Sequence, residues 1–293
     1  MSPLIQWYPG HIAKAEKALL EQLKRVDVVL EVRDARIPLA TKHKRMEEWV
    51  GDRGRILVLN RVDMISPEAR AAWEAWFRAQ GEDPYFTNAQ TGKGVAAVLK
   101  GVQTAGASVN ERRRSRGMRD RPIRAVVIGF PNVGKSALIN RLLKRKVVAS
   151  ARKAGVTRQL RWVRISDEIE LLDAPGVLPA HLHDQDAALK LAICDDIGEA
   201  AYDDQRVAAS LIDLMKVLDT LGPENPYQSA LEQRYDLSLD HRTGETYLHD
   251  LAALRYQNNL NRTARTLLND YRVGHLSALP LEWPIQTPEL EPS

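Results

Sequence analysis

The segment 129–136 reads GFPNVGKS and matches the spacing G-x-x-x-x-G-K-[ST] of a phosphate-binding loop. The β-branched run Ile123–Ile128 before it predicts a strand, and the residues from Lys135 onward predict a helix. In such a loop the backbone N–H groups surround the phosphates, the lysine reaches the β and γ phosphates, and the serine hydroxyl binds Mg²⁺. The loop residues expected to contact a nucleotide are Asn132, Val133, Gly134, Lys135, Ser136 and Ala137.

A second phosphate-side motif, DAPG at residues 173–176, follows an apolar run, so Asp173 is expected at the end of a strand. A carboxylate there holds the metal through a water molecule, and the Gly176 amide meets the γ-phosphate. Thr157 lies between the two motifs, in AGVTR, and is expected to place its hydroxyl on the same ion. The predicted Mg²⁺ ligands are therefore Ser136, Thr157 and, through water, Asp173.

The residues that would recognise the base lie upstream of the phosphate-binding loop. Asn60-Arg-Val-Asp63 and Asn88-Ala89 each follow a short strand-like run. The Asp63 carboxylate can accept hydrogen bonds from N1 and N2 of guanine, which adenine cannot donate, and the Ala89 N–H can donate to guanine O6. The residues before Ile123 therefore represent the second half of a GTPase domain, carried ahead of its first half. Folds tolerate such a circular permutation when the original termini lie close together at the surface.

Together these features resemble the circularly permuted GTPases of the YlqF type over nearly the whole chain. The resemblance includes WYPGHIAKA at residues 7–15, DARIP at residues 34–38 and the permuted order of the motifs. It implies a Mg²⁺-dependent, GTP-hydrolysing factor that binds a late precursor of the large (50S) ribosomal subunit and its rRNA in a GTP-dependent way. It further implies that His11 serves catalysis and that Asn132 helps to hold K⁺.

The valine at position 177 gives separate support to a catalytic role for His11. Many GTPases place a water-orienting glutamine directly after the D-x-x-G motif, and Val177 cannot polarise water. His11 follows Pro9-Gly10 and could act on the attacking water directly or through a bridging water.

Position 61 departs from the family, because Arg61 replaces the usual lysine of Asn-Lys-x-Asp. Its planar guanidinium could stack along the nucleotide, and GTP should still be preferred because Asp63 carries the selection of guanine. The nucleotide-binding residues expected outside the phosphate-binding loop are Asn60, Arg61, Asp63, Asn88, Ala89, Thr157 and Gly176.

The sequence leaves two other functions open. Val177 favours a nucleotide-gated RNA-binding scaffold with negligible turnover, whereas His11 disfavours it. A permuted GTPase acting on another RNA target, such as the small subunit or tRNA, is the third alternative. Because Cys194 is the only cysteine, the chain lacks the zinc-binding cysteine cluster of some relatives of that kind.

Alternating strand-like and helical segments predict an α/β fold with a mostly parallel, doubly wound sheet. We assign residues 1–183 to this circularly permuted P-loop GTPase domain, with a basic linker at 106–122. Further along, helical periodicity replaces the strand-like runs. Residues 184–293 are therefore expected to form a small all-helical domain with a polar tail, which binds RNA or the ribosome.

The chain has 293 residues and a net charge of +4, and its arginines are concentrated in two places. They crowd the linker and line one face of the helix predicted at 260–271, as expected for contact with an RNA backbone. No run approaches the roughly 18 apolar residues of a membrane helix, and the N-terminus lacks the pattern of an export signal. We therefore expect a cytoplasmic protein, and a monomer. The candidate RNA-binding residues are Arg112, Arg113, Arg114, Arg255, Arg262, Arg265 and Arg272.

Overall fold

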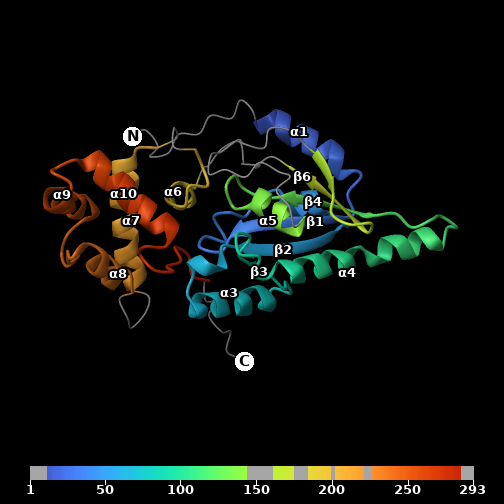
Figure 1. The fold of residues 1–293 in the computed structure, drawn as a ribbon, viewed down its shortest axis with the longest axis horizontal. Coiled ribbons are helices and arrows are strands. Elements are labelled where there is room, and N and C mark those ends of the chain that lie inside the picture. The colour runs from blue at the N-terminus through green and yellow to red at the C-terminus, as the bar shows by residue number, and fades with distance from the viewer. Residues whose placement is uncertain (1–11, 144–160, 175–183, 199–201, 221–225, 285–293) are drawn as a thin grey trace, which may run out of the picture.

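The computed structural model describes residues 12–143, 161–174, 184–198, 202–220 and 226–284 (Figure 1). The strands are β1 Val28–Asp34, β2 Gly54–Asn60, β3 Tyr85–Thr87, β4 Ile123–Ile128, β5 Arg161–Arg164 and β6 Ile169–Asp173. The helices are α1 Ile12–Leu23, α2 Met46–Val50, α3 Pro67–Ala79, α4 Val95–Arg114, α5 Lys135–Leu142, α6 Gln185–Ile193, α7 Asp204–Asp219, α8 Pro226–Tyr235, α9 Gly244–Arg255 and α10 Leu260–Val273. A short 3₁₀ helix, η1 Val62–Met64, follows β2.

All six strands form one sheet in the order β3-β2-β1-β4-β6-β5. Every neighbouring pair is parallel except β5 and β6, which run antiparallel. The strand of the phosphate-binding loop, β4, lies between β1 from the upstream half of the chain and β6 from the downstream half. The permuted halves thus share one sheet, and the predicted mostly parallel α/β fold is confirmed.

Alternating side chains decide which helices cover each face of the sheet. Along β4, Ala125 and Val127 belong to the core that includes buried residues of α4 and α5. Val126 and Ile128 point to the other face and pack with buried residues of α1 and α2. This period of two on a doubly covered strand explains why β4 reads as a continuous apolar run from Ala125 to Ile128.

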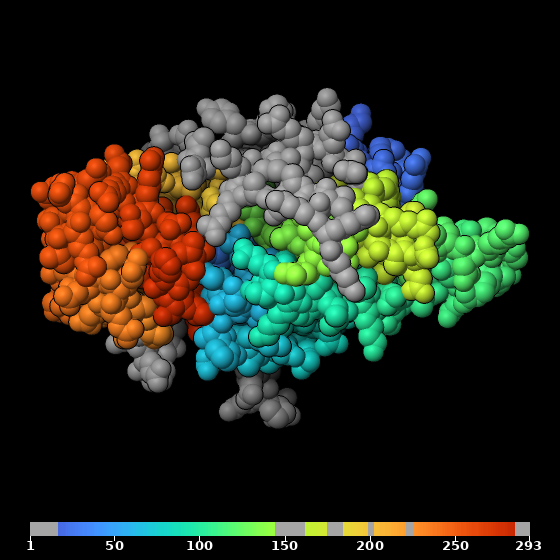
Figure 2. Space-filling view, viewed as in Figure 1, coloured from blue at the N-terminus to red at the C-terminus, as the bar shows by residue number. Residues whose placement is uncertain are grey.

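Helix α4 is longer than the sequence suggests. It continues to Arg114, so the basic linker expected at 106–122 begins as helix and only residues 115–122 connect it to β4. Gly106 serves packing, because a Cβ there would lie 2.6 Å from the Ile123 side chain. The end of α4 and residues 115–122 project beyond the sheet, as Figures 1 and 2 show in green. We refer to residues 107–121 as the basic arm.

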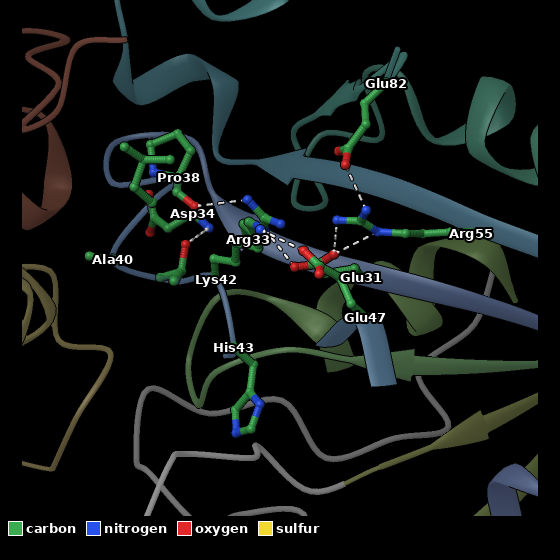
Figure 3. A network of polar contacts seen from close by, with 12 residues as sticks. Glu31, Arg33, Asp34, Pro38, Ala40, Lys42, His43, Glu47, Arg55 and Glu82 are labelled. Atoms are coloured by element: carbon green, nitrogen blue, oxygen red, sulfur yellow. Dashed lines mark hydrogen bonds and ion pairs between the residues drawn. The ribbon is translucent and has the colours of Figure 1, made fainter. Parts of the chain in front are cut away.

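The central strand β1 also carries charged side chains in the interior (Figure 3). Arg33 donates to Glu31 at 2.6 Å, and Arg55 bridges Glu31 at 2.6 Å and Glu82 at 2.7 Å. Burial opposes the ionisation of Glu31, but Arg33 and Arg55 outweigh it and hold its pKa below the usual value. No local sequence pattern predicts this buried ion network, because Arg55 and Glu82 come from β2 and a loop far from β1 in the chain.

Helices α6–α10 lie beside the sheet domain, and their buried faces form part of the same core cluster as one face of the sheet. The helix predicted at 260–271 is confirmed as α10, and its face made of Ala264, Leu267, Leu268 and Tyr271 is buried. Between 184 and 284 the described residues contain helices and no strand. The boundary at 183/184 stays a prediction, and the tail from residue 285 lies outside the described residues.

The segment after α10, residues 276–284, returns to the sheet domain, and we call it the C-terminal strap. The Glu282 N–H donates to the Arg36 carbonyl at 3.2 Å, and the Trp73 indole donates to the Glu282 carbonyl at 3.3 Å. The Glu282 carboxylate accepts the N–H groups of Leu39 at 2.7 Å and Ala40 at 3.1 Å. The helical part is therefore held to the upstream half of the sheet domain as well as joined to β6 by the chain.

Candidate nucleotide site

The phosphate-binding loop has the predicted strand–loop–helix context, with β4 ending at Ile128 and α5 beginning at Lys135. Two of its glycines are required by close packing. A Cβ at Gly129 would collide with the Val32 carbonyl, and one at Gly134 would collide with the Asn60 side chain. Gly134 also has φ +100, in the left-handed region that favours glycine.

Lys135 and Asp173 are both buried, and the charge of each acts on the other. The Lys135 ammonium donates to the Gly129 carbonyl at 3.1 Å and the Phe130 carbonyl at 2.6 Å, and burial lowers its pKa to about 8. Burial raises the pKa of Asp173 to about 6, against the opposing effect of Lys135. Because burial disfavours the charged forms of both groups, a bound phosphate would stabilise the Lys135 ammonium and a bound cation would stabilise the Asp173 carboxylate.

Mg²⁺ fits the oxygen donors at this point. Asp173 pairs in register with Val127 at the end of β6, and its Oδ1 is buried without a hydrogen-bond partner among the described residues. Ser136 lies in the first turn of α5, next to the lysine. A carboxylate and a hydroxyl are the hard ligands that Mg²⁺ prefers.

Asn60 joins the two sequence halves of the site. Its Nδ2 donates to the Val133 carbonyl at 2.8 Å, and its Oδ1 accepts the Ala89 N–H at 3.0 Å and the Thr87 hydroxyl at 3.1 Å. The Ala89 N–H expected to reach guanine O6 is thus engaged by Asn60 and would have to be redirected or shared on binding. The neighbouring Asn88 accepts two backbone N–H groups in its own turn.

Arg61 has φ +64, and its guanidinium bridges two loops. Its Nη2 donates to the Asn132 carbonyl at 2.7 Å, and its Nε lies 3.5 Å from Asp34 Oδ2. The substituted arginine therefore ties the base-recognition loop to the phosphate-binding loop. Asp63 lies in η1, exposed, with no hydrogen bond or ion pair to the described part of the chain, as suits a carboxylate that binds a base.

The helical part also reaches this site, through residues that the sequence analysis gave no role. Arg36 pairs with Asp34 at 2.7 Å and donates to the Cys194 carbonyl at 3.2 Å, and the Asn132 side-chain amide donates to the Asp195 carbonyl at 2.6 Å. Asp34 and Arg36 belong to the DARIP motif, and that motif was the sequence feature that could have indicated a functional role for them. No sequence pattern indicates that this motif contacts residues 194–195.

Three predicted residues, His11, Thr157 and Gly176, lie outside the described residues. The structure therefore says nothing of their geometry. They stay predictions, as does the argument from Val177.

The candidate RNA-binding arginines fall into two separated groups. Arg112, Arg113 and Arg114 lie at the end of α4, where Arg114 pairs with Asp120 at 2.7 Å. Arg255 and Arg262 are exposed on the helical part, and Arg265 is exposed but paired with Asp204 at 2.7 Å.

Arg272 is not part of this outward row. Its guanidinium donates to the carbonyls of Ile193 at 2.9 Å and Ala192 at 2.8 Å and to the Tyr202 hydroxyl at 2.8 Å. The reason is physical, because the last carbonyls of a helix lack the regular i+4 N–H partner and stay open to a donor from another helix, which a guanidinium supplies.

Comparisons with known proteins agree with this site. A family described as 50S ribosome-binding GTPase matches residues 124–243, a range that begins in β4 and leaves out the upstream half of the sheet. Ribosome biogenesis GTPase A of Bacillus pumilus is 35% identical over 234 residues, 80% of each chain. The chain belongs to the ribosome biogenesis GTPase A (YlqF) family. It is therefore a GTPase of ribosome biogenesis.

Two further members of the family extend the likeness to nearly the whole chain. The Bacillus licheniformis protein is 31% identical over 287 residues, 96% of this chain and 99% of its own. GNP-bound YlqF from T. maritima shares the fold, with 22% identity and a TM-score of 0.61 over 93% of this chain and 99% of that chain. Within the described ranges, no helix combines the length and apolar character needed to cross a membrane.

Proposed function

We propose that this YlqF-family GTPase assembles the large (50S) ribosomal subunit, binding its precursor through rRNA in a GTP-dependent way. The single observation that carries the GTP site is the closure of the phosphate-binding loop onto the base-recognition loop through Asn60, at 2.8 Å from Val133 and 3.0 Å from Ala89. The 50S subunit as partner is supported by the family description and by the names of the relatives.

In this proposal Ser136, Thr157 and, through water, Asp173 hold Mg²⁺, which neutralises phosphate charge when bound. Lys135 leaves the loop carbonyls that it now contacts and turns to the β and γ phosphates, while Asp63 selects guanine. The Asn132 amide nitrogen is already engaged by Asp195, so its Oδ1 is the atom that we assign to K⁺. His11 positions or activates the attacking water.

The RNA contacts are proposed for the two outward groups of arginines. Figure 1 places the basic arm and helices α9 and α10 at opposite ends of the molecule, so the two groups would meet different segments of rRNA. Such contacts to phosphates give affinity without base specificity. Contacts of Thr157 and Gly176 with the γ-phosphate would act through the chain that leads into α6 and so adjust the helical part on the RNA. We propose a monomer that acts in the cytoplasm.

The test measures GTP hydrolysis by the wild type and by His11→Ala, in K⁺ and in Na⁺, with and without 50S particles. We expect 50S particles and K⁺ to accelerate the wild type, and His11→Ala to bind GTP with unchanged affinity but to hydrolyse it slowly. A wild type that binds both GTP and 50S particles without turnover would instead be a GTP-gated scaffold. Stimulation by 30S particles or tRNA alone would redirect the proposal to another RNA.

A further inference from the structure

The C-terminal end of α6 lies at the junction between the helical part and the nucleotide site. Asp195 has φ +63, its N–H donates to the Ala192 carbonyl at 3.1 Å, and the Asp196 N–H donates to the Leu191 carbonyl at 2.9 Å. These two bonds form a Schellman motif, which ends the helix sharply. The residue after the left-handed position commonly makes an apolar contact in this motif. Here that position holds an aspartate.

The last carbonyls of α6 are held from both sides of the junction. Arg272 of α10 takes the carbonyls of Ala192 and Ile193. Arg36 and Asn132 of the sheet domain take the next two, those of Cys194 and Asp195. Because Asn132 belongs to the phosphate-binding loop, any change of that loop on nucleotide binding acts directly on the end of α6.

The same junction contains complementary polar groups that do not meet. Asp196 is completely buried, and neither of its carboxylate oxygens has a hydrogen-bond partner in the described ranges. The Arg36 Nη1, also fully buried, is likewise without a partner there. Buried groups of this kind are rare in native proteins, and each one calls for a physical explanation.

The charges around Asp196 show why its ionised form is not stable in this arrangement. It faces the carboxylates of Asp34 and Asp195 and the cations of Arg36 and Arg61, and it also acts on Lys135. Burial raises its pKa to about 8, and the neighbouring carboxylate of Asp34 adds to that shift. An ionised Asp196 would therefore need a direct cationic partner, and Arg36, whose charge already acts on Asp196, has in Nη1 a donor without a partner in the described ranges.

We propose that Asp196 is a positioning residue that reports nucleotide occupancy to the helical domain: when nucleotide fills the phosphate-binding loop, the end of α6 shifts and Asp196 pairs with Arg36 Nη1. Bound phosphates attract Lys135 and change the shape of the loop whose Asn132 holds the Asp195 carbonyl. The end of α6 then loses part of the contact that keeps it in the arrangement described here. The alternative pairing satisfies both buried groups at once. The junction thus has two discrete arrangements, which is what a switch requires.

The inference rests on nucleotide binding at the phosphate-binding loop and needs no ribosome. Its test compares the wild type, Asp196→Asn, Arg36→Lys and the double variant by GTP-analogue affinity and by hydrogen exchange of residues 191–196 with and without nucleotide. Asp196→Asn keeps the shape and removes the charge. Arg36→Lys keeps a positive charge for Asp34 but lacks the Nη1 nitrogen that would pair with Asp196.

We expect each single variant to bind the analogue at least about 5-fold more weakly, the lower range of measured coupling between sites. Each should also lose the nucleotide-dependent change in exchange. The double variant should be no weaker than either single one, because both remove the same pair. The matched control is Asp186→Asn, an exposed carboxylate at the other end of α6, which should behave as the wild type.

The proposal would be overturned if the fold losses in analogue affinity of the two single variants multiplied in the double variant. It would also be overturned if Asp196→Asn kept the nucleotide-dependent change in exchange. An end of α6 that exchanges equally with and without nucleotide in the wild type would do the same. If Asp196→Asn fails to fold, Arg36→Lys carries the test alone through its exchange response. A wild type that binds no GTP would count against the proposed GTP site instead.

Discussion

Among single residues, Asp63 is the one on which base selection rests. Its carboxylate is exposed and makes no contact that the described fold depends on, so Asp63→Asn should leave thermal stability unchanged. The variant loses a charged acceptor for guanine N1 and N2, which costs about 1.5–3 kcal/mol, or roughly 10- to 150-fold in GTP affinity. Titration with a fluorescent GTP analogue measures this loss. Glu68→Gln, an exposed carboxylate nearby on α3, serves as the control and should bind GTP normally.

His43 is a buried imidazole that should make folding sensitive to acid. It stacks on Trp49 with ring centroids 4.2 Å apart, and its Nδ1 accepts the Arg45 N–H at 3.2 Å. Burial, and then the charge of Arg45, lower its pKa from 6.5 to about 4. Between pH 6.5 and pH 4 the unfolded chain binds the proton more readily than the folded protein. The contribution of the neutral imidazole to stability is therefore complete above pH 6.5 and is lost as the pH falls toward 4.

Urea unfolding at several pH values would measure this effect. We expect His43 to remove about 3 kcal/mol of stability between pH 7.5 and pH 4, on top of the contributions of other groups. His43→Gln should be less stable at neutral pH, because it loses the stacking on Trp49, but its stability should fall less steeply with acid. Parallel curves for the two proteins would show that the imidazole is not the group responsible.

At the scale of elements, the basic arm is the feature that the proposed RNA contact makes testable. Arg112, Arg116 and Arg119 are exposed on it, away from the nucleotide site. Replacing all three by alanine should weaken rRNA binding and flatten its salt dependence by about 2–3 in the log–log slope, if each contacts one phosphate of duplex RNA as in DNA. The GTP affinity should not change. Filter binding at several salt concentrations measures the slope.

The matched control removes three exposed basic residues elsewhere, namely Lys24, Lys44 and Arg78. This variant has the same net charge as the arm variant. If it loses as much RNA affinity, overall charge and not the arm is responsible.

The elements also show what the sequence could predict. The strand Ile123–Ile128 and the helix that begins at Lys135 are local patterns, and both are confirmed as predicted. The start of the basic linker at 106 was wrong, because a polar, glycine-containing and basic composition was interpreted as a linker, whereas α4 continues to Arg114 and Gly106 packs against Ile123. Local composition cannot separate those two uses of glycine, since the neighbour that requires the glycine lies far along the chain.

The same limit applies to the site. Motif spacing predicted Asn60 and Lys135 because their chemistry is carried by short segments. The contacts of Arg36 with Cys194 and of Asn132 with Asp195 depend on how the helical part packs, which no motif specifies. Arg272 was misplaced for that reason, because its role depends on the carbonyls at the end of another helix.

For the whole molecule, the C-terminal strap should decide whether the two parts unfold together. The buried Glu282 carboxylate accepts the backbone N–H groups of Leu39 and Ala40, just after the DARIP motif, and lies 3.3 Å from the Lys190 ammonium. Glu282→Ala leaves those donors without partners, at a cost of about 1–3 kcal/mol for each buried group. We expect calorimetry to show one transition in the wild type and two in the variant, with a GTP analogue raising the midpoint temperature of the sheet-domain transition only.

Glu245→Gln, which changes an exposed carboxylate on α9, should keep the single transition. A single transition that merely moves to lower temperature in Glu282→Ala would mean that the core shared by the sheet and helices α6–α10, and not the strap, holds the molecule together.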